Sequence, residues 1–113
     1  MDSMVRAGDQ QVGSLVLMSD YLAPTPLWVG VGACLGHGYL ERLGLPEPLA
    51  QQLLAWQELF DAHYRQEGGW DSPDAATIYE QDGHQLQAAL QEALPDSVVQ
   101  LDLWPITGQA PSV

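Results

Sequence analysis

The chain has 113 residues, 46% of them hydrophobic, and a formal net charge of −12 at pH 7. This length and hydrophobic content fit one domain with a core of its own, and the single Cys34 excludes an intramolecular disulfide. Lysine is absent and the cations are Arg6, Arg42 and Arg65, so nucleic acid and anionic membranes are disfavoured as partners and basic proteins are favoured. Solubility, or a GC-rich genome, is the alternative explanation of the acidity.

The N-terminal segment does not predict a signal peptide or a membrane anchor. Residues 1–12 are polar and predict a loose arm, in which either Met1 or Met4 can be the native start. The apolar run Val12–Met18 is shorter than the roughly 20 residues of a membrane span, and it lacks the basic start of a secretory signal. We therefore expect a cytoplasmic protein, a location that also suits a lone cysteine.

The first predicted element is a buried strand at residues 14–21, because a compact apolar run there ends at Ala23-Pro-Thr-Pro26. The next segment, residues 27–39, has glycine at positions 30, 32, 36 and 38, which is too much glycine for a stable helix. We expect a short strand followed by a loop in this segment.

Two amphipathic helices are predicted next. The first is marked by apolar residues at steps of three and four, and Gly68-Gly69 ends it. The second begins at Ser72-Pro-Asp74, where a capping serine, a proline and an acid suit the first turn, and Pro95 ends it. Gly83 lies on its apolar face and permits close approach of the two helices. The stripes are Leu49, Leu53, Trp56, Phe60 and Tyr64 in the first helix, and Ala75, Tyr79, Leu86, Leu90 and Ala93 in the second.

Residues 97–104 predict a second buried strand, with Val99, Leu101 and Leu103 on one face and Pro105 at its end. The two strands should lie in one sheet, since neither is stable alone. Residues 107–113 predict a flexible tail. The fold class is therefore α+β, with two amphipathic helices packed on one face of a small β-sheet, in a single domain over residues 13–106.

The sequence contains no recognisable catalytic or metal-binding motif. Cys34-Leu-Gly-His37 offers two ligands where zinc needs three or four, and His63 and His84 lie on different helices. No serine has the glycine-flanked turn of an exposed nucleophile, and the glycines from position 30 do not fit the dinucleotide fingerprint. We therefore expect no metal, no cofactor and no enzymatic activity.

Asp20 and Asp102 are the alternative candidates for chemistry. Each lies near the end of a predicted strand, so neighbouring strands would bring both carboxylates into one cleft, where paired carboxylates can perform acid–base catalysis. The competing interpretation makes both of them ordinary turn or cap residues.

A protein-binding surface is the leading interpretation. Residues 58–82 contain seven acids and one arginine, hence six net negative charges, and Trp70 lies in the middle. An aromatic residue inside an acidic rim is typical of a protein-binding hot spot, although Trp70 can also fold back onto the helices as part of the core. The candidate partner-binding residues are Glu58, Asp61, Glu67, Trp70, Asp71 and Asp74.

Several aromatic segments carry a family resemblance, which spans residues 15–106. The segments are Met18-Ser-Asp-Tyr21, Pro26-Leu-Trp28, Trp56-Gln57, Phe60-Asp61 and Leu101-Asp-Leu-Trp-Pro105. In these segments the chain resembles small proteins of GC-rich bacteria, some of which look like immunity proteins of polymorphic and contact-dependent toxin systems. The resemblance implies an acidic cytoplasmic inhibitor that binds a cognate toxin, and it transfers no functional residue to this chain.

Three functions are thus open. The leading hypothesis is an acidic protein-binding module of the inhibitor type, which neutralises a basic toxin by surface binding. A non-catalytic accessory protein or homodimeric adaptor is the alternative, and a small enzyme using Asp20 and Asp102 is the third. A neighbouring toxin gene would favour the first, self-association the second, and a pocket holding both aspartates the third.

Overall fold

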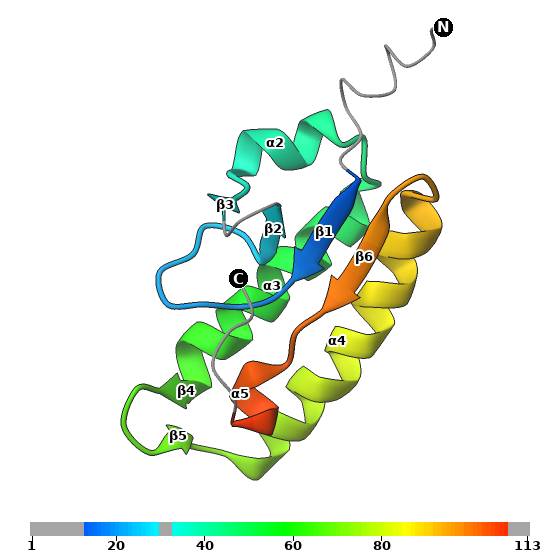
Figure 1. Cartoon of the computed structure of the whole chain (residues 1–113). Coiled ribbons are helices and arrows are strands. Elements are labelled where there is room, and N and C mark those ends of the chain that lie inside the picture. Colours follow the sequence, from blue (N-terminus) through cyan, green and yellow to red (C-terminus); the bar gives the residue numbers. More distant parts are fainter. Residues whose placement is uncertain (1–12, 30–32, 109–113) are drawn as a thin grey trace, which may run out of the picture.

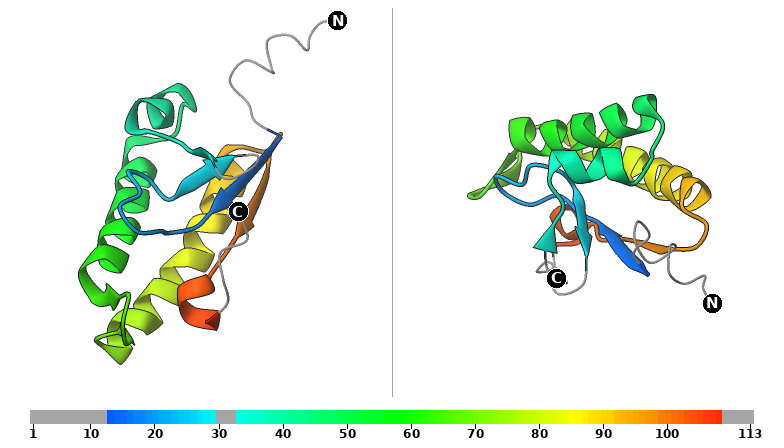
Figure 2. Two further views of the ribbon diagram at one scale, coloured as in Figure 1. Left: turned by 60° about the vertical axis from the view of Figure 1, so that its left-hand side comes forward. Right: turned by 90° about the horizontal axis from the view of Figure 1, so that it is seen from above.

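The computed structural model of the chain describes residues 13–29 and 33–108. Within these residues four strands form a mixed sheet, and two long helices lie on one of its faces (Figures 1 and 2). This confirms the α+β class and the predicted layering. The arm predicted at residues 1–12 lies outside the described residues, as do residues 109–113 of the predicted tail. The strands, in sheet order, are β3 (Ala33–Cys34), β2 (Leu27–Val29), β1 (Ser14–Leu17) and β6 (Val98–Leu101).

The strands β1 and β6 make the longest pairing in the sheet. They pair in parallel, with Leu15 opposite Val99 and Leu17 opposite Leu101, which confirms that the two predicted strands share a sheet. The strand β1 ends at Leu17 rather than at Tyr21. The reason is a loop that leads back into the antiparallel strand β2, closed by a hydrogen bond from the amide of Met18 to the carbonyl oxygen of Pro26 (2.8 Å).

On either side of residues 30–32, the glycine-rich segment contains more secondary structure than its composition predicts. The expected short strand is present as β2, but β3 and the helix α2 (His37–Arg42) stand where a loop was expected. Glycine lowers helix propensity by only about 1 kcal/mol per residue, and tertiary packing can override that cost. Here Leu35 and Leu40 are both buried in the core, and this packing is the local reason for the added order.

The two long helices follow the predicted stripes in eight of ten residues. They are α3 (Glu47–His63) and α4 (Pro73–Ala93), and they make the most extensive helix–helix contact in the fold. The exceptions to the stripes are Ala93, which is exposed, and Tyr64, which lies beyond the first helix because that helix ends at His63, before the predicted end at Gly68-Gly69. As predicted, Ser72 caps α4, its hydroxyl oxygen accepting a hydrogen bond from the amide of Ala75 (3.2 Å). Between the helices lies a hairpin that was not predicted, formed by β4 (Tyr64–Arg65) and β5 (Gly69–Trp70).

The last predicted strand is wrong at its C-terminal end. It stops at Leu101, and Trp104–Thr107 form the short helix α5. The Asp102 carboxylate accepts a hydrogen bond from the amide of Trp104 (3.0 Å), which turns the chain out of the sheet. The Trp104 indole then donates to the buried carbonyl oxygen of Ser19 (2.7 Å). Alternation of apolar residues favoured a strand, but the packing of this indole decided against it.

The core lies between the sheet and the two long helices. From the stripes and the last predicted strand, eight residues are expected to be mostly buried, and six of them are: Leu53, Trp56, Phe60, Tyr79, Leu86 and Leu90. The other two, Leu101 and Leu103, are half-buried because they lie on and just beyond the edge strand β6. At Gly83 the helix α4 packs closely against its neighbours, since a Cβ atom there would stand 3.1 Å from the Trp56 ring and 3.2 Å from Leu103.

Candidate functional site

The acidic residues singled out from the sequence lie along one connected stretch of the fold. Glu58 and Asp61 are on α3, Glu67 is in the turn of the β4–β5 hairpin, and Asp71 and Asp74 lead into α4. All five carboxylates are exposed. Asp74 lies in the first turn of α4, where the positive end of the helix dipole stabilises a negative charge.

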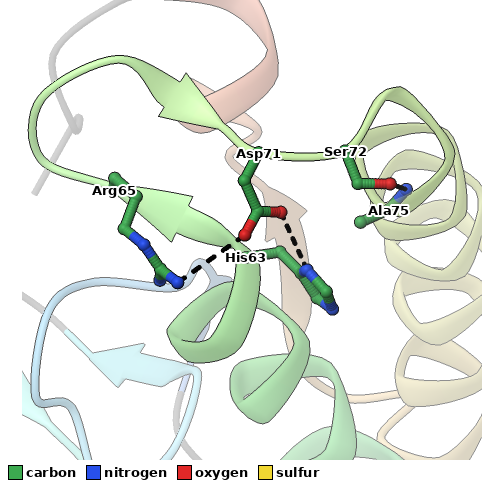
Figure 3. Close-up of polar contacts among 5 residues, drawn as sticks. All are labelled: His63, Arg65, Asp71, Ser72 and Ala75. Atoms are coloured by element: carbon green, nitrogen blue, oxygen red, sulfur yellow. Dashed lines mark hydrogen bonds and ion pairs between the residues drawn. The ribbon is translucent and has the colours of Figure 1, made fainter.

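Asp71 differs from the other carboxylates because it is paired within the chain. Its two oxygens lie 2.9 Å from Nδ1 of His63 and 3.6 Å from the guanidinium of Arg65 (Figure 3). These contacts tie the end of α3 and the strand β4 to the segment that follows β5. Asp71 therefore holds the hairpin against the helix, and Arg65 serves that contact.

Trp70 is half-buried and packs toward the core. Its indole donates a hydrogen bond to the carbonyl oxygen of Pro105 (3.0 Å), and its ring centroid lies 5.2 Å from that of Tyr64 and 5.0 Å from that of Tyr79. The ring thus closes an aromatic cluster between α3, α4 and α5. Only part of its surface is left for a partner, so the carboxylates are the more accessible members of the predicted site.

A turn at residues 20–23 agrees with the interpretation of Asp20 as a turn residue. The amide of Ala23 donates to the carbonyl oxygen of Asp20 (3.3 Å), and Leu22 has a positive φ of 61°. Leu22 is 97% exposed, whereas the Tyr21 ring packs between those of Phe60 and Trp104. The sequence reasoning missed the left-handed conformation and the exposure of Leu22.

Asp20 and Asp102, the two aspartates of the enzyme hypothesis, accept hydrogen bonds from nearby backbone amides. The parallel pairing of β1 and β6 places both after the carboxyl ends of neighbouring strands, as expected. However, the Asp20 carboxylate accepts from the amide of Tyr21 (2.8 Å), and the Asp102 carboxylate accepts from the amide of Trp104. Both arrangements are local caps.

A groove of about 550 Å³ opens between α3 and α4. Its lining is mainly apolar, with the buried Trp56 at its base and the 47% exposed Ile78 at its rim. Neither Asp20 nor Asp102 belongs to it, so it is not the shared cleft that the enzyme hypothesis requires. The lining residues are Gln52, Ala55, Trp56, Leu59, Ile78, Asp82, Gln85, Leu86 and Ala89.

The outer edge of β6 is occupied by side chains of α4. The amide of Val99 donates to Oε1 of Gln91 (3.0 Å), and Nε2 of Gln91 donates to the carbonyl oxygen of Ser97 (2.6 Å). Nε2 of Gln87 donates to the carbonyl oxygen of Val99 (2.8 Å). Because these three edge groups are already paired, this part of the strand is a poor template for the addition of a partner strand.

Among the residues whose side chains are described, Cys34 does not join a group of metal ligands. In the described part of the chain no three His, Cys, Asp or Glu side chains are grouped so as to hold a metal ion. The thiol of Cys34 instead donates to the carbonyl oxygen of Thr25 (3.2 Å). Among residues 13–29 and 33–108, no helix is both long and apolar enough to cross a bilayer.

These features define a small acidic α+β domain whose distinctive surface is a run of exposed carboxylates on α3, the hairpin and the start of α4. The model of the Serratia CdiI immunity protein-like family matches residues 13–100, and the chain belongs to that family. The match covers the sheet, both long helices and the hairpin, and it confirms the resemblance to immunity proteins of toxin systems. No curated protein matches the chain.

Proposed function

We propose that this protein is a cytoplasmic inhibitor that neutralises a cognate toxin by binding to its surface, without a catalytic step. Membership of an immunity protein-like family supports the toxin as partner. The observation that carries the proposal is the run of exposed carboxylates Glu58, Asp61, Glu67 and Asp74, since a basic protein surface is its natural complement.

The charge balance around these carboxylates supports a basic partner. Arg65, the one arginine between residues 58 and 82, lies against Asp71. The Asp61 carboxylate accepts a hydrogen bond from the neutral side chain of Gln57 (3.0 Å), which leaves its charge in place. Like charges gathered on one surface repel each other in the free protein, and a cationic partner relieves that repulsion on binding.

The physical role of this surface is to speed encounter and to form charge-assisted hydrogen bonds. Electrostatic steering raises association rates by roughly tenfold to a thousandfold at low salt, and the effect falls as the Debye length shrinks below about 10 Å. Carboxylates that meet Lys or Arg directly make bonds about twice as strong as neutral ones. An inhibitor needs both, because it must capture a toxin quickly and release it slowly.

The test compares two triple variants that remove the same charge from different places. Glu58→Gln, Glu67→Gln and Asp74→Asn together remove three exposed carboxylates from the proposed surface, whereas the control variant carries Glu41→Gln, Glu92→Gln and Asp96→Asn, all exposed and outside it. Binding to the purified cognate toxin is measured at two salt concentrations.

We expect the first variant to associate at least about tenfold more slowly at low salt and to lose most of the salt dependence of its affinity. The control variant should keep the wild-type rate to within about twofold. Equal losses in the two variants would show that only the net charge matters. Self-association of the chain without any binding of the toxin would favour a homodimeric adaptor instead.

A further inference from the structure

The turn at Leu22 combines two features that folding does not explain. Its φ of 61° lies in the left-handed region, which a bulky residue rarely adopts and which glycine or asparagine would occupy with less strain. At the same time Leu22 is 97% exposed, so no packing against residues 13–29 or 33–108 compensates for the conformation. Strained, exposed residues of this kind occur preferentially at ligand and partner contacts.

Contacts of Asp20 and Tyr21 hold the first residues of the turn in place. Tyr21 is 40% exposed as a residue, and the centroid of its ring lies 5.4 Å from that of Phe60 and 5.9 Å from that of Trp104. The Asp20 carboxylate accepts from the amide of Tyr21 (2.8 Å), which fixes the first residues of the turn. Leu22 is therefore an exposed apolar residue in a turn whose backbone is held by its neighbours Asp20 and Tyr21.

The turn also adjoins the acidic surface. Nε2 of Gln57 donates to the carbonyl oxygen of Asp20 (2.9 Å) and to the carboxylate of Asp61 (3.0 Å), so one side chain connects the base of the turn to that surface. The loop between β1 and β2 reaches toward α3 in Figures 1 and 2, in keeping with these contacts. Two carboxylates, those of Asp20 and Asp61, thus lie near the start of the turn that carries Leu22.

We propose that Leu22 is the apolar anchor of the interface with a basic protein partner, entering a hydrophobic pocket whose cationic rim meets Asp20 and Asp61. The inference rests on the proposed function and specifies its binding surface. Because the backbone of the turn is already ordered in the free protein, little backbone entropy is lost on binding, and the burial of Leu22 contributes more fully to affinity than it would from a mobile loop. The neighbouring charges then orient the partner around it.

The experiment uses two substitutions that suit the backbone of the turn but remove the apolar side chain. Leu22→Gly and Leu22→Asn both tolerate a positive φ, so each should leave the thermal stability of the chain unchanged or raised. Both should weaken binding to the purified cognate toxin at least about tenfold, because the favourable burial of one leucine side chain in the interface is lost. The loss should appear mainly as a faster off-rate.

Two exposed apolar residues elsewhere serve as matched controls. Val98, on β6, is 57% exposed, and Ile78 lies at the rim of the groove between α3 and α4. Val98→Ala and Ile78→Ala should each change the dissociation constant less than about twofold. Retained affinity in both Leu22 variants overturns the inference, and a large loss in Ile78→Ala alone would place the apolar contact in the groove.

The salt experiment separates this inference from the proposed function. If the acidic triple variant binds the toxin more weakly while both Leu22 variants bind normally, the toxin-binding function stands and the anchor is refuted. If the wild-type chain does not bind the toxin at all, the proposed function fails and the anchor fails with it.

Discussion

The indole of Trp56 stacks face to face on the ring of Tyr79, with centroids 4.3 Å apart and planes inclined by 8°, and its Nε1 donates to the carbonyl oxygen of Tyr79 (2.8 Å). This pair joins α3 to α4 across the core, and only 2% of Trp56 is exposed. The relationship makes the helix pair one packed unit. The acidic surface and the Leu22 turn are built on that unit.

Trp56→Ala is therefore expected to lower the free energy of unfolding by about 3–5 kcal/mol, because it leaves a large cavity between the helices and removes the hydrogen bond of the indole to α4. Urea denaturation measures the loss. Trp56→Phe, which retains most of the ring, should cost distinctly less. A loss below about 1 kcal/mol for the alanine variant would mean that the helices do not depend on this stack.

Gly83→Ala separates helix propensity from packing. Propensity alone predicts a gain of up to about 1 kcal/mol, but the new Cβ atom would stand 3.1 Å from the Trp56 ring and 3.2 Å from Leu103. We expect a net loss of about 1–3 kcal/mol in the free energy of unfolding, as for other overpacked cores. Gly38→Ala in α2 is the control, since a Cβ atom there meets nothing within 4 Å and should be neutral or stabilising.

Stability should fall as the pH rises above about 10, the usual pKa of tyrosine. Burial raises the pKa of Tyr79 above that value; the neighbouring Ser19 opposes the shift in part, and the charge of Asp102 adds to it. Because the unfolded chain then releases the Tyr79 proton first, this stability is present below pH 10 and is lost as the pH increases. The slope should approach 1.4 kcal/mol per pH unit, roughly, for this one group.

The control for the alkaline loss is Tyr79→Phe, which removes the ionisable hydroxyl and keeps the stacked ring. Urea denaturation at several pH values between neutrality and strong alkali compares the two chains. The variant should show a clearly shallower decline above pH 10. Identical profiles for the variant and the wild type would assign the alkaline loss to other groups.

Gln91→Ala should loosen the edge of the sheet. It removes the acceptor for the amide of Val99 and the donor to the carbonyl oxygen of Ser97, at an expected cost of about 1–3 kcal/mol. Hydrogen exchange of the Val99 amide should accelerate. Gln81→Ala, at an exposed position on the same helix, should leave that exchange rate unchanged. Unaltered protection of Val99 in the Gln91 variant would show that this side chain does not hold the edge.

The sequence by itself determined the two long helices and their relation to the sheet. Their apolar stripes follow the helical period, and Ser72-Pro-Asp74 marks the start of the second helix by local hydrogen bonding and backbone geometry. Gly83 was also recognisable as a point of close approach. These features are set by residues within a few positions of each other, which is why periodicity and capping rules were sufficient to find them.

Contacts between distant segments were decided only by the tertiary structure. Trp104 leaves the predicted strand because its indole reaches the carbonyl group of Ser19, and Trp70 turns inward because Pro105 offers it an acceptor. Leu22 takes a left-handed conformation that no local residue preference predicts. In each case the energy of a long-range contact, or of the turn that such contacts hold in place, exceeds the small local propensities that a sequence displays, so these three conformations were visible only after folding.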